Sequence, residues 1–372
     1  MQLAYTLRRG NQYHTTVIEA VDSLEPDISV IMPAYNAALT LEASLAALRA
    51  SIGPSIEVIL VDDCSTDRTA EIAEGAGVRV VRLPRQSGAA VARNAGAHLA
   101  RADLLFFTDS DVMVRPDAIA RAVRVLRDEP TLSAVFGSYT AATVHANFSS
   151  RYKNLVHHLT HQAARPEAKT FWGAAGAVRS ADFWAVDGFD PRDTRTADVE
   201  DIALGYRLSR RGYQIRLDRD LQVMHAKRYD LFSLIRSDVV HRAIPWTRLM
   251  LRERMYQRDL NTTDSSLSSA AAVLLFGPAL LAGMFHPLGL AVAGLLLATF
   301  LFLNRRLFAA LARHGGLRFA LASVPMTALY YVYATFGALI GLALHIRQPR
   351  HAPRSDGILT SPHPSDSKSQ VA

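Results

Sequence analysis

The sequence predicts an α/β domain with a mainly parallel sheet, followed by helices that enter a membrane. Strand-like and helix-like runs alternate after Pro26, which is typical of βα units whose sheet is covered on both faces. No Asp, Glu, Lys or Arg occurs between Ser266 and Leu303, and a second apolar stretch runs from Phe319 to Ile346. Uncharged runs of that length favour a bilayer over the core of a soluble protein.

The expected strands are short apolar runs rich in β-branched residues. They are ISVIM (28–32), EVILV (57–61), VRVVRL (78–83), LLFFT (104–108) and SAVFGSY (133–139). Sequences with helical spacing separate them, at 40–50, 67–77, 87–100 and 116–129. Ligands of such sheets bind at the carboxyl ends of the strands, so functional side chains are expected there.

Four regions are predicted along the chain. They are a loose arm at 1–26, the α/β domain at 27–258 with basic juxtamembrane helices at its end, a membrane region at 259–346, and a disordered tail at 347–372. Within the membrane region we expect segments at about 268–285, 288–304 and 320–346. Three spans would place the tail outside, whereas Arg347, Arg350 and Arg354 favour the inside. The conflict leaves open a segment that is re-entrant or lies in the interface.

Charge and cysteine content indicate a cytosolic catalytic domain on the inner membrane. The net charge is +7, and arginines crowd between Arg207 and Arg258, directly before the apolar run. A basic belt beside an apolar segment is suited to binding anionic lipid headgroups, so we expect no nucleic-acid partner. The N-terminus has no apolar signal segment. The single cysteine, Cys64, cannot form an internal disulfide, which fits a reducing compartment.

Polar residues follow three of the expected strands. The first strand runs into Pro33, Ala34, Tyr35 and Asn36, the second into Asp62 and Asp63, and the fourth into Asp109 and Asp111. A single Asp pair is explained equally well by a turn or a helix cap. Their occurrence at several successive strand ends predicts a ligand site on one rim of the sheet.

Asp109 and Asp111 fit a metal bound to a diphosphate. Residues i and i+2 of a strand point the same way, so both carboxylates can address one ligand. Mg²⁺ and Mn²⁺ bind through one or two carboxylates plus substrate phosphates. No GxxxxGK[ST] sequence occurs, which argues against an ordinary ATPase or kinase. The small-residue loop before Arg93 predicts an anion site at a helix start, with capping and a surface salt bridge as the alternative.

Further along the chain, Glu200 and Asp201 fall in the first turn of an expected helix. The helix dipole stabilises carboxylates there, which by itself can explain why both residues are acidic. A carboxylate at a crevice can also deprotonate an acceptor hydroxyl. His225 ends a strand-like stretch and can be a metal ligand or a structural histidine.

Residues 28–230 resemble a family 2 glycosyltransferase of the GT-A fold. The resemblance rests on PAYN (33–36), VDDCSTD (61–67), ARNAGAHLA (92–100), FFTDSD (106–111), FWGAAGAVRSADFWAVDGFD (171–190), VEDIALGYRLSRRGY (199–213) and VMH (223–225). It implies an enzyme that uses a UDP-, GDP- or dTDP-sugar with Mn²⁺ or Mg²⁺ and inverts the anomeric centre by direct displacement.

The resemblance also implies residue roles. Asp201 matches the catalytic base, with Glu200 beside it positioning the acceptor. Asp111, Asp109 and His225 match the metal and diphosphate site, while Gly173 and Ala174 lie in the loop between donor sugar and acceptor. The nucleotide pocket would be formed by Pro33, Ala34, Tyr35, Asn36, Asp63 and Arg93.

Two departures from the family pattern narrow the prediction. Processive synthases carry QxxRW after the base, where this chain has Arg242-Ala-Ile-Pro-Trp246, and many relatives have an acidic residue where Ala203 stands. We therefore expect single sugar transfer to a lipid-linked or membrane-associated acceptor. A processive polysaccharide synthase and a non-catalytic scaffold of the same fold are the alternatives. Nucleotidyl transfer is less favoured, because the first loop after Ile31 lacks a glycine-rich, lysine-bearing sequence.

Overall fold

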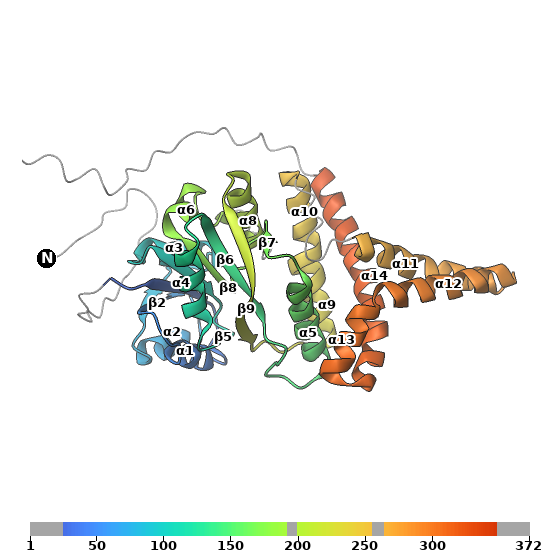
Figure 1. Cartoon of the computed structure of the whole chain (residues 1–372), viewed down its shortest axis with the longest axis horizontal. Helices are drawn as coiled ribbons and strands as arrows, with labels where there is room; N and C mark the ends of the chain where they lie inside the picture. The colour runs from blue at the N-terminus through green and yellow to red at the C-terminus, as the bar shows by residue number, and fades with distance from the viewer. Residues whose placement is uncertain (1–24, 192–198, 255–263, 348–372) are drawn as a thin grey trace, which may run out of the picture.

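The computed structural model describes residues 25–191, 199–254 and 264–347 (Figure 1). The predicted arm, apart from its last two residues, and the predicted tail from residue 348 lie outside this part of the chain. The described residues form an α/β domain followed by a group of C-terminal helices, and the predicted fold class is confirmed.

One half of the sheet is parallel, as predicted. Its strands are β1 (Ile28–Ala34), β2 (Ile56–Asp62), β3 (Arg79–Arg82) and β4 (Leu104–Thr108), in the order β3-β2-β1-β4. Strand order reverses beside β1, where such folds bind their ligands. Residues of β1 alternate between two cores. Val30 and Met32 pack with α1 (Leu41–Arg49) and α2 (Thr69–Gly75), and Ile31 packs with α3 (Ala89–Leu99).

The other half of the sheet is mixed. β4 pairs antiparallel with β8 (Ala175–Arg179), β8 pairs antiparallel with β6 (Leu132–Tyr139), and β6 runs parallel to β9 (Gln214–His225). Two short strands, β5 (Val112–Val114) and β7 (Glu167–Ala168), pair antiparallel with β9. The sequence reading missed β5, β7 and β8, because they are short or rich in glycine and alanine.

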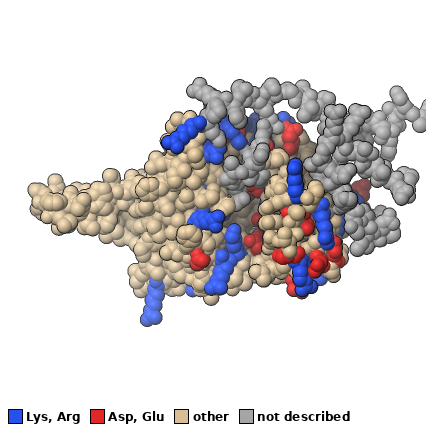
Figure 2. All heavy atoms as spheres, turned by 180° about the vertical axis from the view of Figure 1, so that it is seen from behind, with Lys and Arg blue, Asp and Glu red and all other residues tan. Residues whose placement is uncertain are grey.

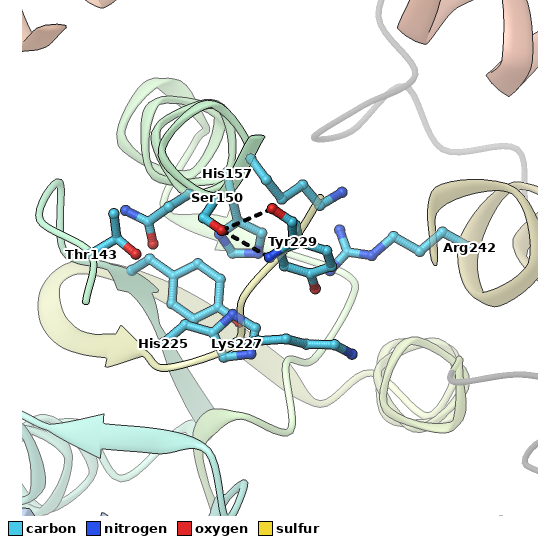
Figure 3. Close-up of a pocket in the computed structure, with 10 residues that line it drawn as sticks. Thr143, Ser150, His157, His225, Lys227, Tyr229 and Arg242 are labelled. Atoms are coloured by element: carbon cyan, nitrogen blue, oxygen red, sulfur yellow. Dashed lines mark hydrogen bonds between the residues drawn. The ribbon is translucent and has the colours of Figure 1, made fainter. Parts of the chain in front are cut away.

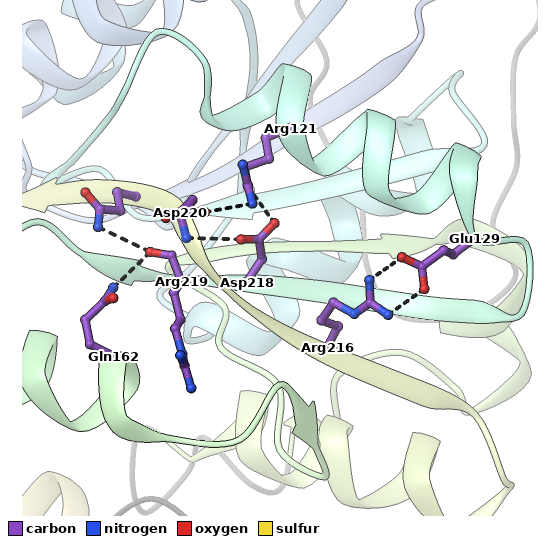
Figure 4. A network of polar contacts seen from close by, with 8 residues as sticks. Arg121, Glu129, Gln162, Arg216, Asp218, Arg219 and Asp220 are labelled. Carbon is purple, nitrogen blue, oxygen red and sulfur yellow. Dashed lines mark hydrogen bonds and ion pairs between the residues drawn. The ribbon is translucent and has the colours of Figure 1, made fainter.

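Ion pairs fix the long strand β9 against its neighbours (Figure 4). Arg121 of α4 (Ala118–Asp128) contacts Asp218 at 2.6 Å and Asp220 at 3.0 Å. Arg216 binds Glu129 at the end of the same helix. These pairs hold the middle of β9, so its last residue, His225, has a fixed position at the rim.

Helices complete the domain and lead to the C-terminal region. They are α5 (Phe148–Ala163), α6 (Ser180–Ala185), α8 (Glu200–Arg210), α9 (Leu231–Asp238), the π-helix η1 (Val239–Ala243) and α10 (Ile244–Glu253). The last three follow one another without a break and stand between the sheet and the C-terminal helices (Figure 1).

The C-terminal region contains four helices. They are α11 (Asp264–Gly283), α12 (Pro287–Leu303), α13 (Arg305–Gly315) and α14 (Leu317–Arg347). Each predicted segment coincides with a helix, and His286 lies between α11 and α12. By length and composition α11 and α14 could each cross a bilayer, and so could α12 with α13 if that pair, bent by 60°, is one span.

Candidate active site

The polar strand ends lie side by side, as the sequence predicted. β1 lies between β2 and β4 in the sheet, and Ala34 pairs in register with Asp62. The amide of Asp63 donates to the carbonyl of Ala34 at 2.8 Å, which extends the pairing into the loops. The ends of these three strands therefore form one continuous rim.

Asn36 ties the first loop of this rim to the second. Its backbone amide donates to Ser65 Oγ at 2.9 Å, and its side-chain oxygen accepts from the Thr66 amide at 2.9 Å. The backbone of Asn36 is left-handed, with φ of 49°, a conformation that asparagine tolerates better than most residues. Pro33 and Ala34 belong to β1 itself, and the Tyr35 side chain is left 44% exposed at the rim.

Asp63 fixes the loop that begins α3. Its two carboxylate oxygens accept from the amides of Ser87 at 2.7 Å and Gly88 at 2.8 Å. Burial raises the pKa of Asp63, and the two amide hydrogen bonds oppose that rise. We expected the amides of this loop to bind an anion of the ligand. That expectation was wrong for Ser87 and Gly88, because both amides bind the carboxylate of Asp63.

Arg93 lies in the centre of the site, bonded to two carboxylates. Its guanidinium donates to Glu200 at 2.6 Å and to Asp109 at 2.7 Å, and it packs over the Phe189 ring. Burial lowers the pKa of Arg93, but the two neighbouring carboxylates outweigh it and the net shift is upward. The alternative of a surface salt bridge was wrong, since the Arg93 side chain is only 6% exposed.

Glu200 and Asp201 are neighbours with different surroundings. Glu200 is 4% exposed and paired with Arg93. Asp201 accepts from the amide of Gly173 at 3.0 Å, and its other oxygen accepts from the first turn of α8. Burial raises the pKa of Asp201, against the lowering effect of the Gly173 amide and of Arg93. A raised pKa makes a carboxylate a better proton acceptor.

Gly173 separates the carboxylate of Asp201 from Arg93. A Cβ at this position would lie 3.4 Å from the Asp201 Cβ and 3.5 Å from the Arg93 Cζ. The next residue, Ala174, is buried in the core and keeps this loop in place. The predicted loop residues therefore lie directly against the predicted base.

Asp111 and His225 form the second pair of the rim. His225 Nε2 is 3.3 Å from an Asp111 oxygen, and the imidazole stacks on Tyr139 with ring centroids 5.0 Å apart. Burial raises the pKa of Asp111, but the hydrogen bond and charge of His225 outweigh it, and the pKa lies below its ordinary value. The Asp109 carboxylate is bound to Arg93, and burial raises its pKa.

The donor set of this pair fits a divalent cation in part. In the described ranges no three His, Cys, Asp or Glu side chains are gathered closely enough to hold a metal by themselves. Asp111 and His225 are close enough to share one ion, and cations of this kind complete their shell with substrate phosphates. The predicted third ligand, Asp109, is instead engaged by Arg93.

His225 also lines a polar pocket (Figure 3). Its cavity has a volume of about 20 Å³ and is lined by Tyr139, Thr143, Ser150, Lys153, Asn154, His157, His225, Lys227, Tyr229 and Arg242. Three of these side chains are cationic. Lys153 pairs with Asp238, whereas Arg242 makes no hydrogen bond or ion pair with any residue of the described ranges.

The sequence reading missed most of this pocket. Asn154, His157 and His161 recur on one face of α5 at helical spacing, a polar stripe that could have drawn attention to this helix. His157 and His161 contact Trp172, which precedes Gly173, so the aromatic side chains behind the pocket also support the loop at the base. The sequence drew attention to Arg242 only because it stands where processive synthases have the glutamine of QxxRW. Trp246 of that segment donates to the Tyr206 hydroxyl at 3.3 Å and holds α10 on α8.

Comparison with known proteins identifies the domain. Residues 29–186 match the sequence model of glycosyl transferase family 2. The chain carries a family 2 glycosyltransferase domain. A mannosyltransferase from Pyrobaculum calidifontis, solved in complex with GDP-Man and Mn²⁺, has the same fold, with a TM-score of 0.54 at 19% identity, over 89% of this chain and 91% of that one. The GT-A fold of the family 2 domain is thereby confirmed.

Curated relatives match over shorter stretches. The succinoglycan biosynthesis protein ExoO of Rhizobium meliloti is 37% identical over 107 residues, which are 28% of this chain and 30% of that protein. The undecaprenyl-phosphate 4-deoxy-4-formamido-L-arabinose transferase of Pseudomonas paraeruginosa is 36% identical over 105 residues, 26% of this chain and 31% of that protein. The family 2 domain thus matches about a third of the length of these relatives.

Proposed function

We propose that the protein is an inverting glycosyltransferase, which moves one sugar from a nucleoside-diphosphate sugar to a lipid-linked acceptor at the membrane. The observation that carries this proposal is the position of Asp201. Its carboxylate lies against the Gly173 loop, and the preceding residue, Glu200, is joined through Arg93 to Asp109 on the donor rim. Base and donor residues that are distant in sequence thus meet at one site.

The chemical step assigned to Asp201 is removal of the remaining proton from a singly protonated acceptor phosphate, whose oxygen forms the bond to the anomeric carbon as the nucleoside diphosphate leaves. Its raised pKa makes the carboxylate a stronger base, while the Gly173 amide fixes its orientation. Arg93 and Glu200 hold the first turn of α8 against β4, and so they position Asp201 without touching the acceptor.

The donor would bind along the rim. We assign contacts with the nucleoside to Tyr35, Asn36 and Asp63 at the rim, and contacts with the diphosphate to Asp109 and Arg93. Asp111 and His225 would hold the metal, which when bound neutralises charge on the departing diphosphate. An imidazole ligand favours Mn²⁺ over Mg²⁺, because Mg²⁺ strongly prefers oxygen.

The acceptor is proposed to be a lipid phosphate. The pocket beyond His225 presents Lys153, Lys227 and Arg242, and a phosphate would supply the counter-charge that Arg242 lacks. The same pocket lies against the C-terminal helices, because Tyr333 of α14 donates to Asp238, the partner of Lys153. The similarity to a transferase named for undecaprenyl phosphate supports this chemistry.

A reconstituted assay tests the proposal. The protein in nanodiscs is given UDP-, GDP- or dTDP-sugars with Mn²⁺, and undecaprenyl phosphate or a soluble hydroxyl compound as acceptor. We expect transfer of one sugar to the lipid phosphate, loss of activity with EDTA and recovery with Mn²⁺. Transfer that ignores EDTA would contradict the metal assignment. A ladder of longer products would indicate a processive synthase, and binding of every donor without transfer would indicate a scaffold.

A further inference from the structure

The longest apolar helix, α14, is packed against protein along almost its whole length. Its buried residues lie on one side of the helix, so they form one stripe. They are Phe319, Ala320, Ser323, Met326, Thr327, Tyr333, Gly337 and Gly341. The stripe extends over roughly 33 Å at 1.5 Å per residue.

Specific contacts along this stripe reach the catalytic domain. Near its start, Thr327 Oγ1 lies 3.0 Å from the hydroxyl of Tyr152 on α5, and in the middle Tyr333 donates to Asp238 at 2.8 Å. Near its end, a Cβ at Gly341 would lie 2.7 Å from the carbonyl oxygen of Ile244 on α10. Both the first and last parts of α14 are therefore fixed to the same body.

That body cannot enter hydrocarbon. Leu249 of α10 packs with Val199, Ala203 and Tyr206 around the start of α8, which carries the proposed base. If α14 spanned the roughly 30 Å hydrocarbon core, the elements beside it would be drawn to the same depth. Those elements carry Asp238, Lys153 and Arg242, and a bilayer interior does not solvate such charges.

The hairpin of α11 and α12 behaves differently. Its few buried residues in α11, Ser269 and Ala272, lie near the base, and the tip residues Met284 and Phe285 are 77% and 84% exposed. The base is fixed by Asn304, which donates to Ser269 at 3.0 Å and accepts from Tyr331 of α14 at 3.2 Å. The hairpin projects away from the domain in Figures 1 and 2, and no charged side chain is visible along it.

The face of α14 opposite the domain is apolar and uncovered. Leu321, Leu329, Phe336 and Leu339 are exposed on it, at 61%, 36%, 57% and 55%. Exposed arginines occur where the hairpin returns and in the helices that follow, at Arg305, Arg306, Arg313 and Arg318. An apolar face with flanking arginines is suited to one leaflet that contains anionic lipid.

We infer that only the α11–α12 hairpin enters the bilayer and returns, while α14 lies in the plane of the leaflet next to the catalytic domain. The inference rests on the membrane association in the proposed function and replaces the predicted span at 320–346. It places both ends of α14 on the catalytic side, which removes the conflict between three spans and a basic C-terminal segment beginning at Arg347.

Depth measurements test this geometry. Leu321→Cys, Leu329→Cys and Leu339→Cys, each in a Cys64→Ser background, carry an environment-sensitive dye in vesicles with lipids brominated at defined depths. We expect one common depth for the three sites and a greater depth for Leu295→Cys in the hairpin. A spanning α14 would place Leu329 far deeper than the other two and overturn the inference. If no site is quenched by any lipid, the membrane association itself is wrong.

Sidedness provides an independent measurement. Cys64 is exposed on the catalytic domain and reports that side when an impermeant maleimide is added to oriented membrane vesicles. Arg318→Cys and Arg347→Cys, in the Cys64→Ser background, should be labelled only in the vesicle orientation that labels Cys64. Labelling of Arg347→Cys from the opposite side would show that α14 crosses the bilayer.

Discussion

The two sides of the active site differ in how their polar groups are satisfied. On the donor rim, Asp63, Arg93 and Glu200 are bonded to each other or to backbone amides within the protein. In the pocket beyond His225, Arg242 has no such partner among the described residues, and Lys227 contacts only the Tyr229 ring. Rim residues should therefore matter for the folded geometry as well as for catalysis, whereas pocket residues should matter chiefly for the ligand that completes them.

The largest expected effect on the rim comes from Asp201→Asn. General-base catalysis contributes about 10²–10⁴-fold, so kcat should fall by that factor while donor affinity by calorimetry stays unchanged. Because burial raises the Asp201 pKa, the wild-type rate should fall as pH is lowered through it, when the base becomes protonated. Glu200→Gln is the matched variant, since it can still accept from Arg93. If it lost more activity than Asp201→Asn, Glu200 would be the base.

The second prediction concerns Arg93→Met, which removes the ion pair between Arg93 and the buried Glu200. Removing one member of a buried pair typically costs about 3–5 kcal/mol, so the melting temperature should fall clearly. Adding Glu200→Gln to this variant should restore part of the loss. Arg68→Met is the control, because the exposed Arg68–Glu71 pair is worth at most about 1 kcal/mol. Equal melting temperatures for the two single variants would contradict a structural role of the rim network.

The pocket should respond in the opposite way. Arg242→Met removes a charged donor, and hydrogen bonds to charged groups are worth about 1.5–3 kcal/mol, or roughly 10–100-fold in affinity. We expect the KM for lipid phosphate to rise by that factor with little change in melting temperature. Arg236→Met, at an exposed position of α9, serves as the control. A rise in the donor KM alone would reassign the pocket to the donor diphosphate.

The smallest effect is a pH dependence of acceptor binding. Burial, together with the charges of Arg242 and Lys227, lowers the pKa of Lys153 to about 8, although Asp238 opposes the shift. The ammonium is charged below that pH, so kcat/KM for the lipid phosphate should fall as pH rises through about 8. Lys153→Arg keeps its charge and should remove this limb. An unchanged limb in that variant would exclude Lys153 as its origin.

Local sequence patterns predicted much of the fold and about half of the residues of the candidate site. The runs around Ile31, Leu60 and Phe107 are apolar and flanked by turn residues, so their strands and the polar residues that follow could be placed. The contact between Arg93 and Glu200 could not be predicted in this way. Glu200 is 107 residues away, and its position in the first turn of a helix already had an ordinary explanation. The pocket was missed for a related reason, since it combines α5, the end of β9 and η1, and no one segment displays it.

The orientation of α14 was also beyond the sequence reading. Mean hydropathy is the same whether such a helix is surrounded by lipid or has one face on a protein. Tyr152 and Asp238, which contact that face, lie far from α14 in sequence. Only the folded structure shows that one face of the apolar helix α14 packs against protein.

Two glycines on α14 lie where this helix packs closely against the catalytic domain. A Cβ at Gly337 would lie 2.7 Å from Ala243, the neighbour of Arg242, just as one at Gly341 would meet the backbone of α10. A single methyl group at either position would have to push the helix and the domain apart, and the guanidinium of Arg242 would shift with η1. Under the two proposals made above, a change in the depth of α14 in the leaflet would therefore also change the binding of phosphate by Arg242.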